Sequence, residues 1–200
     1  MYPHTLTLRD GAEVRVRPIE AGDRDALGAA FERLSDESRY RRFLGPVERL
    51  GPSMLSYLTE VDHRDHEALA AFDPGGDLVG VGRYVREGAG ATAEAAVTVA
   101  DEWQNRGLGT ALTALLAERA LDEGIGTFTA SMLAQNRDML DLLASVGSVQ
   151  VTGREGGTVE VEVALEPERP GAGRGLYGVL RAAASRVAAI ADPLFTDSRR

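Results

Sequence analysis

The sequence predicts an α/β (α+β) domain built on a mixed sheet and followed by a helical tail. First, segments with strand alternation and segments with helical periodicity follow one another along most of the chain. Second, glycine-containing turns at 73–76 and 156–157 each join two strand-like segments, as hairpins do. Third, the proline- and glycine-rich stretch EPERPGAGRG has the composition of a linker. We therefore expect a domain over residues 1–165 and a tail over residues 166–200.

The first part of the chain contains one strand and two helices by these criteria. EVRVRPI (13–19) alternates valine with arginine, which is typical of a strand with one buried face. Asp23 stands where it can cap a helix through DALGAAFERL (25–34). SMLSYLTEV (53–61) predicts a second, short helix.

The middle of the chain predicts three strands and the last part predicts two helices and three strands. HEALAAF (66–72) and DLVGVGRYVRE (77–87) flank the first hairpin turn, and ATAEAAVTVA (91–100) is a third strand. The later segments are a helix around residues 112–120, a strand over 126–133, a helix over 136–146 and two strands over 148–153 and 158–165.

Composition excludes several kinds of chemistry. The chain has no cysteine, so it has no disulfide, thiolate metal site or cysteine nucleophile, and this composition suits a cytoplasmic protein. The net charge of −9 argues against a nucleic-acid partner. No stretch is long and apolar enough to span a membrane, and the N-terminus lacks the pattern of a secretion signal. All 22 basic residues are arginine, so no lysine side chain of this protein can be acylated.

The stretch DEWQNRGLGTALTALLAERAL (101–121) joins a predicted strand to a predicted helix through Gly107 and Gly109. The first N–H groups of a helix lack intrahelical partners, and glycine lets a ligand approach the backbone closely. Together with the helix dipole, these groups form an anion site that suits a pyrophosphate. The loop alone is equally compatible with a turn that binds nothing, because the short pattern is common in a chain rich in Arg, Gly and Ala.

The order of these pieces resembles the GNAT acetyltransferase superfamily. The matching segments are LRDGAEVRVRPI, LSDESRYRRF, VGVGRYVR, AEAAVTVADEWQNRGLGT and NRDMLDLLASVG, within residues 12–165. The resemblance looks closest to the single GNAT domain of bacterial protein lysine acetyltransferases. It implies a mostly antiparallel mixed sheet of about six to seven strands, with a central splay and about four flanking helices.

The resemblance also implies that acetyl-CoA is the cofactor and that an amine is the acceptor. The loop from Gln104 to Thr110 would bind the pyrophosphate, the backbone of Val97 to Val99 would pair with the pantetheine amides, and Asn136 would hydrogen-bond the cofactor arm. For Asn136 a helix N-cap is an equally good interpretation, and the two roles are compatible. The residues expected to bind the cofactor are Val97, Thr98, Val99, Gln104, Asn105, Arg106, Gly107, Leu108, Gly109, Thr110 and Asn136.

Glu94 is the candidate general base. An acceptor amine of the lysine type has a pKa near ~10.4 and must lose a proton before it attacks a thioester. Strand alternation places Glu94 on the same face as Ala96 and Thr98, where burial among small apolar side chains would strengthen it as a base. In the enzymes that the chain resembles, a glutamate at this position is the base. The alternative is a strand glutamate that faces water, and the loop acids Asp101 and Glu102 are weaker candidates.

The sequence departs from the family pattern in the last predicted helix. Many GNAT enzymes have a tyrosine seven residues after the asparagine, where it protonates the leaving thiolate, and this chain has Leu143 there. The following Gly-Phe pair of the family is Gly147-Ser148. Tyr84 and Tyr40 could replace that tyrosine, although packing in the core is the plainer expectation for both.

Three further features have functional and structural interpretations. His63 and His66 have the spacing of a metal pair, but no further ligands follow nearby, so we expect no metal. A contact as a base or with the substrate is one alternative, and a surface or capping role is the favoured one. The basic cluster RYRRF (39–43) either grips an acidic substrate or is simply solvated. The tail helix, with an apolar face from Leu176 to Ile190, packs on its own domain or on a second subunit, or else contacts a membrane or partner.

Three functions remain open on this evidence. The chain acetylates a protein lysine, or it acetylates a small amine or a protein N-terminus, or it binds acyl-CoA without turnover as a regulatory module.

Overall fold

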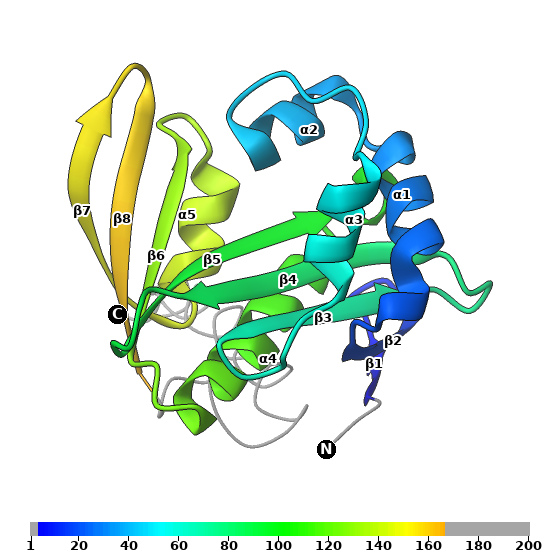
Figure 1. Ribbon diagram of the computed structural model, residues 1–200, viewed down its shortest axis with the longest axis horizontal. Coiled ribbons are helices and arrows are strands. Elements are labelled where there is room, and N and C mark those ends of the chain that lie inside the picture. The colour runs from blue at the N-terminus through cyan, green and yellow to red at the C-terminus, as the bar shows by residue number, and fades with distance from the viewer. Residues whose placement is uncertain (1–3, 167–200) are drawn as a thin grey trace, which may run out of the picture.

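The computed structural model describes residues 4–166, and these residues form one eight-stranded mixed sheet with five α-helices (Figure 1). The strand order is β1-β2-β3-β4-β5-β6-β8-β7. The strands are β1 (His4–Thr7), β2 (Glu13–Pro18), β3 (His66–Phe72), β4 (Leu78–Arg86), β5 (Thr92–Val99), β6 (Thr127–Leu133), β7 (Gly147–Glu155) and β8 (Thr158–Leu165). The helices are α1 (Arg24–Arg33), α2 (Asp36–Phe43), α3 (Pro52–Thr59), α4 (Leu108–Asp122) and α5 (Arg137–Ala144), with short 3-10 turns η1 (Ala21–Asp23) and η2 (Asp101–Trp103).

Helices cover both faces of the sheet. Figure 1 shows α4 behind the strands and α1 and α3 in front of them, while α2 lies above the gap between β5 and β6. The larger hydrophobic core lies between the sheet and α4, whose Leu112 and Leu116 are fully buried. A smaller core lies under α1 and α3. The central strand β3 is buried on both faces for this reason, whereas β8 alternates buried and exposed residues.

The sheet opens between β5 and β6. β5 pairs antiparallel with β4 over most of its length, but it pairs parallel with β6 only from Thr92 to Glu94. Beyond Glu94 the two strands diverge, so the remaining outer edge of β5 has no strand partner in the sheet. The predicted fold class and the central splay are confirmed.

Two elements were not predicted from the sequence. β1 is only four residues long and pairs at the edge of the sheet, which raises the strand number to eight. α2 is the fifth helix, and all of its residues are exposed or only partly buried, so it shows no apolar periodicity. It begins because the Ser35 hydroxyl accepts a hydrogen bond from the backbone N–H of Ser38.

The capping role predicted for Asp23 is wrong. Asp23 precedes α1, but its side chain makes no capping hydrogen bond to that helix. Its carboxylate instead accepts two hydrogen bonds from Arg17, at 2.6 and 2.7 Å, and one from the backbone N–H of Glu20. The predicted tail helix lies outside the described residues, and the boundary at residue 165 stays a prediction.

Candidate functional site

The loop before α4 presents a row of free backbone donors. Within the part of the chain that the structure describes, no hydrogen bond occupies the backbone N–H groups from Asn105 to Thr110, and the first occupied one belongs to Ala111. Asn105 and Gly107 have positive φ angles of 61° and 93°, which turn the chain into the helix. Consecutive amides at a helix N-terminus bind anions through hydrogen bonds and the helix dipole. The structure thus brings together the loop residues expected to bind a pyrophosphate.

Two of these loop residues are constrained by packing. Leu108 is fully buried in the core, so only its backbone can face a ligand. A Cβ on Gly109 would lie 3.2 Å from the Leu142 side chain of α5, so glycine lets the two helices approach closely here.

Arg106 is already engaged by its neighbours. Its guanidinium forms an ion pair with Asp10 at 3.2 Å and lies 4.9 Å from the Trp103 ring centroid. The backbone N–H of Arg9 donates to the Arg106 carbonyl, and a Cβ on Gly107 would lie 3.3 Å from Arg9 Nε. Arg9 is therefore the basic side chain beside the free amides, although the sequence pattern pointed to Arg106. No local signal identifies Arg9, because it comes from the distant β1–β2 hairpin.

The open edge of β5 leads from the splay to this loop. Val97, Thr98 and Val99 pair with β4 on one side only. The side-chain amide of Gln104 donates to the Val99 carbonyl at 3.1 Å and to the Ser38 hydroxyl at 3.3 Å. Gln104 thus fixes the loop against the end of β5 and against α2.

Asn136 is the N-cap of α5. Its side-chain oxygen accepts a hydrogen bond from the backbone N–H of Met139 at 3.2 Å, which confirms the capping interpretation. The capping contact uses the oxygen only, and the side-chain NH₂ stays available to donate.

Glu94 lies at the point where the sheet divides. It pairs with Val85 of β4 on one side and with Thr129 of β6 on the other. Its neighbours on the same face, Ala96 and Thr98, line a cavity. The side chain is exposed, so the expected burial among small apolar residues is wrong, and a glutamate that faces water is what the structure shows.

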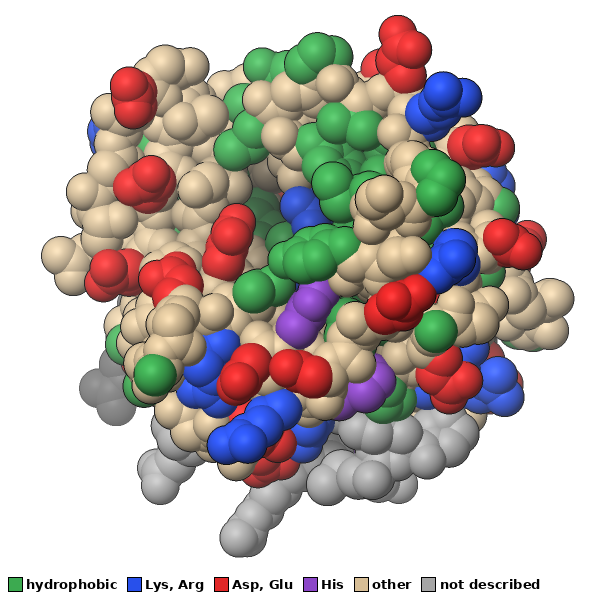
Figure 2. All heavy atoms as spheres, viewed as in Figure 1, with side chains coloured by type: hydrophobic (Ala, Val, Ile, Leu, Met, Phe, Trp, Pro, Cys, Tyr) green, Lys and Arg blue, Asp and Glu red, His purple; other side chains and the backbone are tan. Residues whose placement is uncertain are grey.

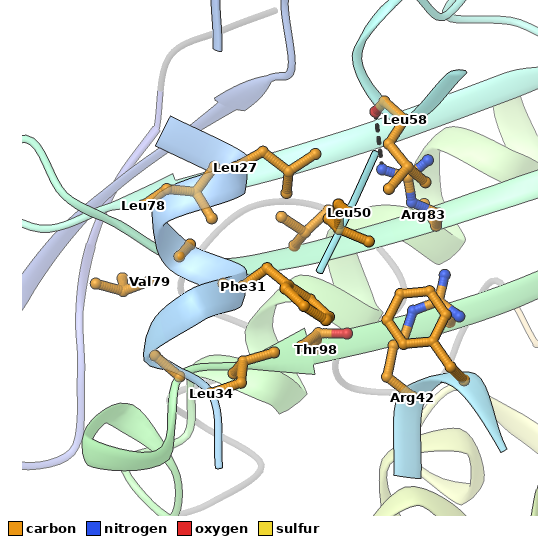
Figure 3. A pocket seen from close by; sticks show the side chains of 16 residues that line it. Leu27, Phe31, Leu34, Arg42, Leu50, Leu58, Leu78, Val79, Arg83 and Thr98 are labelled. Atoms are coloured by element: carbon orange, nitrogen blue, oxygen red, sulfur yellow. Dashed lines mark hydrogen bonds between the residues drawn. The ribbon is translucent and has the colours of Figure 1, made fainter. Parts of the chain in front are cut away.

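The cavity is partly open to solvent and lies between the sheet and helices α1, α2 and α3. Figure 2 shows a hollow on this face, with hydrophobic side chains around it and a basic side chain inside it. In Figure 3, Leu27, Phe31 and Leu34 form one wall, and Arg42 and Arg83 lie together at the opposite end.

Both arginines are positively charged, because a guanidinium is not deprotonated in proteins. Burial lowers the pKa of Arg83 to about 10, and the positive charge of Arg42 adds to this effect. Burial also lowers the pKa of Arg42, against the opposing influence of Glu94. Arg83 donates to the Leu58 carbonyl at 2.9 Å, as the dashed line in Figure 3 marks, and lies 3.0 Å from His66 Nε2.

The two histidines contact other side chains, and neither caps a helix within residues 4–166. His63 Nδ1 lies 2.8 Å from Glu67, and His66 contacts Arg83. Among the described residues, no group of three or more His, Cys, Asp or Glu side chains could hold a metal ion.

The two tyrosines differ in placement. Tyr84 is fully buried and its hydroxyl donates to the Arg64 carbonyl, and burial raises its pKa further. Tyr40 is 46% exposed, so the expectation that it packs in the core is wrong. Leu143 is buried in the core against α4 and the sheet.

No helix within residues 4–166 is long and apolar enough to cross a membrane.

Comparisons with known proteins agree with this geometry. The model of the acetyltransferase (GNAT) family matches residues 30–147. Acetyltransferase Pat of Mycolicibacterium smegmatis is 34% identical over 167 residues, which are 82% of this chain and 50% of that protein, so the chain spans half the length of this relative. Acetyltransferase PA5475 of Pseudomonas aeruginosa is 34% identical over 72% of this chain and 78% of its own. The crystal structure of the GNAT domain of S. lividans PAT superposes with a TM-score of 0.75 at 35% identity, over 82% of this chain and 97% of that one.

Proposed function

Because the chain belongs to the GNAT acetyltransferase family, we propose that it transfers the acetyl group of acetyl-CoA to a primary amine, foremost a protein lysine side chain. The observation that carries the proposal is the row of N–H groups from Asn105 to Thr110, to which no group of residues 4–166 is hydrogen-bonded. A helix start that leaves these donors free and places Gly107 in a left-handed conformation fits a diphosphate.

The residues around the splay fit the rest of the cofactor. The free edge of β5 offers backbone groups of Val97 and Val99 to amides of an extended arm, as a neighbouring strand would. The NH₂ of Asn136 at the start of α5 adds a donor, and the side chain of Arg9 adds a positive charge beside Gly107. When bound, acetyl-CoA supplies the activated thioester.

Glu94 takes the proton of the acceptor. Glu94 lies where β5 and β6 separate, on the same face as Ala96 and Thr98, which line the cavity. Its carboxylate is therefore near both the splay and the cavity. Since the side chain is exposed, water can relay the proton from the acceptor ammonium to it. The amine nitrogen then bonds to the acetyl carbon, the carbon–sulfur bond breaks, and coenzyme A leaves as the thiolate, while the second proton of the nitrogen passes to water or to that thiolate.

No tyrosine is required to protonate that thiolate. Thiols have pKa values near ~8.5, so the thiolate is a good leaving group at neutral pH. Tyr84 is unsuited to the task because its hydroxyl is buried and bonded to Arg64.

A lysine acceptor is supported by the acidic character of the chain, with its net charge of −9, and by the exposure of Glu94. A small amine is the second candidate, and the cavity beside Glu94 favours it.

Two experiments test the proposal. Calorimetry with coenzyme A should show saturable binding, and thiol release from acetyl-CoA with an acyl-CoA synthetase or a panel of small amines should show turnover.

Glu94→Gln should lower kcat about a hundredfold or more and leave coenzyme A affinity unchanged. Glu162→Gln on the neighbouring β8 is the matched control and should behave like the wild type. Binding without any thiol release would instead identify a regulatory acyl-CoA-binding module, and the absence of binding would reject all three functions.

A further inference from the structure

The cavity beside Glu94 contains two positive charges that the described chain does not neutralise by direct contact. Within residues 4–166, no carboxylate lies within 4.0 Å of the guanidinium of Arg42 or of Arg83. Arg83 is held by Leu58 and His66, and the Arg42 guanidinium lies 5.0 Å from the ring centroid of Phe43. Burying two like charges together is unfavourable unless an anion joins them.

The two arginines come from separate elements and lie at one end of the cavity. Arg42 is on α2 and Arg83 is on β4, and Figure 3 shows both at the same end of the cavity, with the Thr98 hydroxyl directed toward that end. Leu27, Phe31 and Leu34 line the other end. This arrangement suits a ligand with an apolar part and a compact polar group.

We propose that Arg42 and Arg83 bind a carboxylate of the acceptor, so that the acceptor is an amphipathic amine that carries a carboxylate near its reacting nitrogen. The inference rests on the proposed acetyl transfer and specifies its acceptor.

The charges favour a monoanion over a phosphate. Arg42 and Arg83 contribute two positive charges, and Glu94 is the acidic group whose charge acts on Arg42, so the net local charge is close to +1. A carboxylate balances this charge, and the planar fork of a guanidinium matches its two oxygens. The same arginines repel an ammonium, so an acceptor amine without an accompanying anion is disfavoured at this end of the cavity.

The carboxylate could belong to a free amino acid or to an acidic residue beside a target lysine. Three substrate pairs separate these sources: L-leucine with 3-methylbutan-1-amine, 6-aminohexanoate with hexylamine, and a blocked tetrapeptide containing glutamate before lysine with its glutamine counterpart. For each pair, the ratio of kcat/KM is measured in the wild type and in Arg42→Gln. Comparing the two proteins cancels the intrinsic difference in amine basicity within a pair.

At least one pair should favour its carboxylate member in the wild type, and Arg42→Gln should reduce that preference about tenfold or more. Arg41→Gln is the control on the same helix, because Arg41 pairs with Glu37 and Asp138 at the surface. Arg42→Lys keeps the charge without the fork and should retain part of the preference. If Arg42→Gln leaves the ratio of every pair unchanged, the inference is wrong.

A binding measurement separates this inference from the transferase proposal. N-acetyl-L-leucine and N-acetyl-L-leucinamide are titrated in the presence of coenzyme A, into the wild type and into Arg42→Gln. If the acid binds in an Arg42-dependent manner and no amine is acetylated, the carboxylate site stands and the transferase proposal fails. If only carboxylate-free amines are acetylated and the acid shows no Arg42-dependent binding, the transferase proposal stands and the carboxylate site is wrong.

Discussion

The hydroxyl of Ser38 donates a hydrogen bond to the carboxylate of Asp101 at 2.7 Å and thereby joins α2 to the turn that follows β5. The same carboxylate accepts from the backbone N–H and the hydroxyl of Ser35. Helix α2, which carries Arg42, is thus held against the segment that leads into the loop before α4, where the backbone N–H groups from Asn105 to Thr110 lie. Partial burial acts to raise the pKa of Asp101, but the hydrogen bonds from Ser35 and Ser38 outweigh it, and the pKa is lowered.

Asp101→Asn should destabilise this connection. The two hydroxyls donate to one carboxylate oxygen and the backbone N–H of Ser35 donates to the other, so an amide that keeps its oxygen toward the hydroxyls turns an NH₂ toward the Ser35 N–H and loses that hydrogen bond. We expect the free energy of unfolding to fall by about 1 kcal/mol. Urea denaturation measures this change. Glu102→Gln, one residue along in η2, is the control and should unfold at the wild-type midpoint. Equal midpoints for all three proteins would contradict the structural role of Asp101.

Gly107→Ala should impair coenzyme A binding. The residue has a φ of 93°, where a Cβ costs roughly 1 kcal/mol or more, and relaxation of that strain would turn the neighbouring amides. We expect the dissociation constant for coenzyme A, measured by calorimetry, to rise about tenfold. Gly124→Ala has a similar backbone angle, 76°, at the other end of α4 and tests strain alone. It should lose stability but keep the wild-type affinity, and a matched loss of affinity would argue against the amide loop as the binding site.

Variants of Asn136 should separate capping from ligand binding. Asn136→Ala removes the acceptor for the Met139 N–H and should cost about 1 kcal/mol of stability. Asn136→Asp keeps that acceptor but loses the NH₂ donor, so its stability should match the wild type while its affinity for coenzyme A falls severalfold. Thermal unfolding and calorimetry give the two readouts. Should the aspartate variant bind coenzyme A as the wild type does, Asn136 serves only as a cap.

His66 should make the stability depend on pH. Burial and the nearby charge of Arg83 lower its pKa from 6.5 to about 4, because Arg83 always donates and the ring nitrogen must accept. Between these values the unfolded chain binds a proton that the folded protein excludes, so this contribution to stability is complete above about pH 6.5 and is lost as the pH falls toward 4.

The test compares the free energy of unfolding at pH 7 and pH 4.5 in three proteins. His66→Gln can still accept from Arg83 and should lose less stability on acidification than the wild type. His4→Gln, on β1 at the edge of the sheet, should lose as much as the wild type. An identical loss in the His66 variant would show that this ring does not set the pH dependence.

Local patterns identified most of the elements because burial repeats with the period of the backbone. The alternation in TVEVEVAL and the apolar run in HEALAAF correspond to β8 and β3, and the segment around Gly107 begins α4. α2 was not predicted from the sequence because none of its residues is fully buried and its start depends on one serine cap. β1 was not predicted because four residues are too few to show the alternation of a strand, and its stability comes from pairing with β2.

For the site, the sequence by itself determined the amide loop, the cap at Asn136 and the position of Glu94 on its strand, because each follows from residues adjacent in the chain. The tertiary structure decided what those residues face. In the folded chain Glu94 is exposed, and Arg106 pairs with Asp10. Arg9 lies against Gly107, and Arg42 lies at the same end of the cavity as Arg83. The physical reason is that burial and charge around a side chain come from elements distant along the chain, and only the packing of helices on the sheet brings them together.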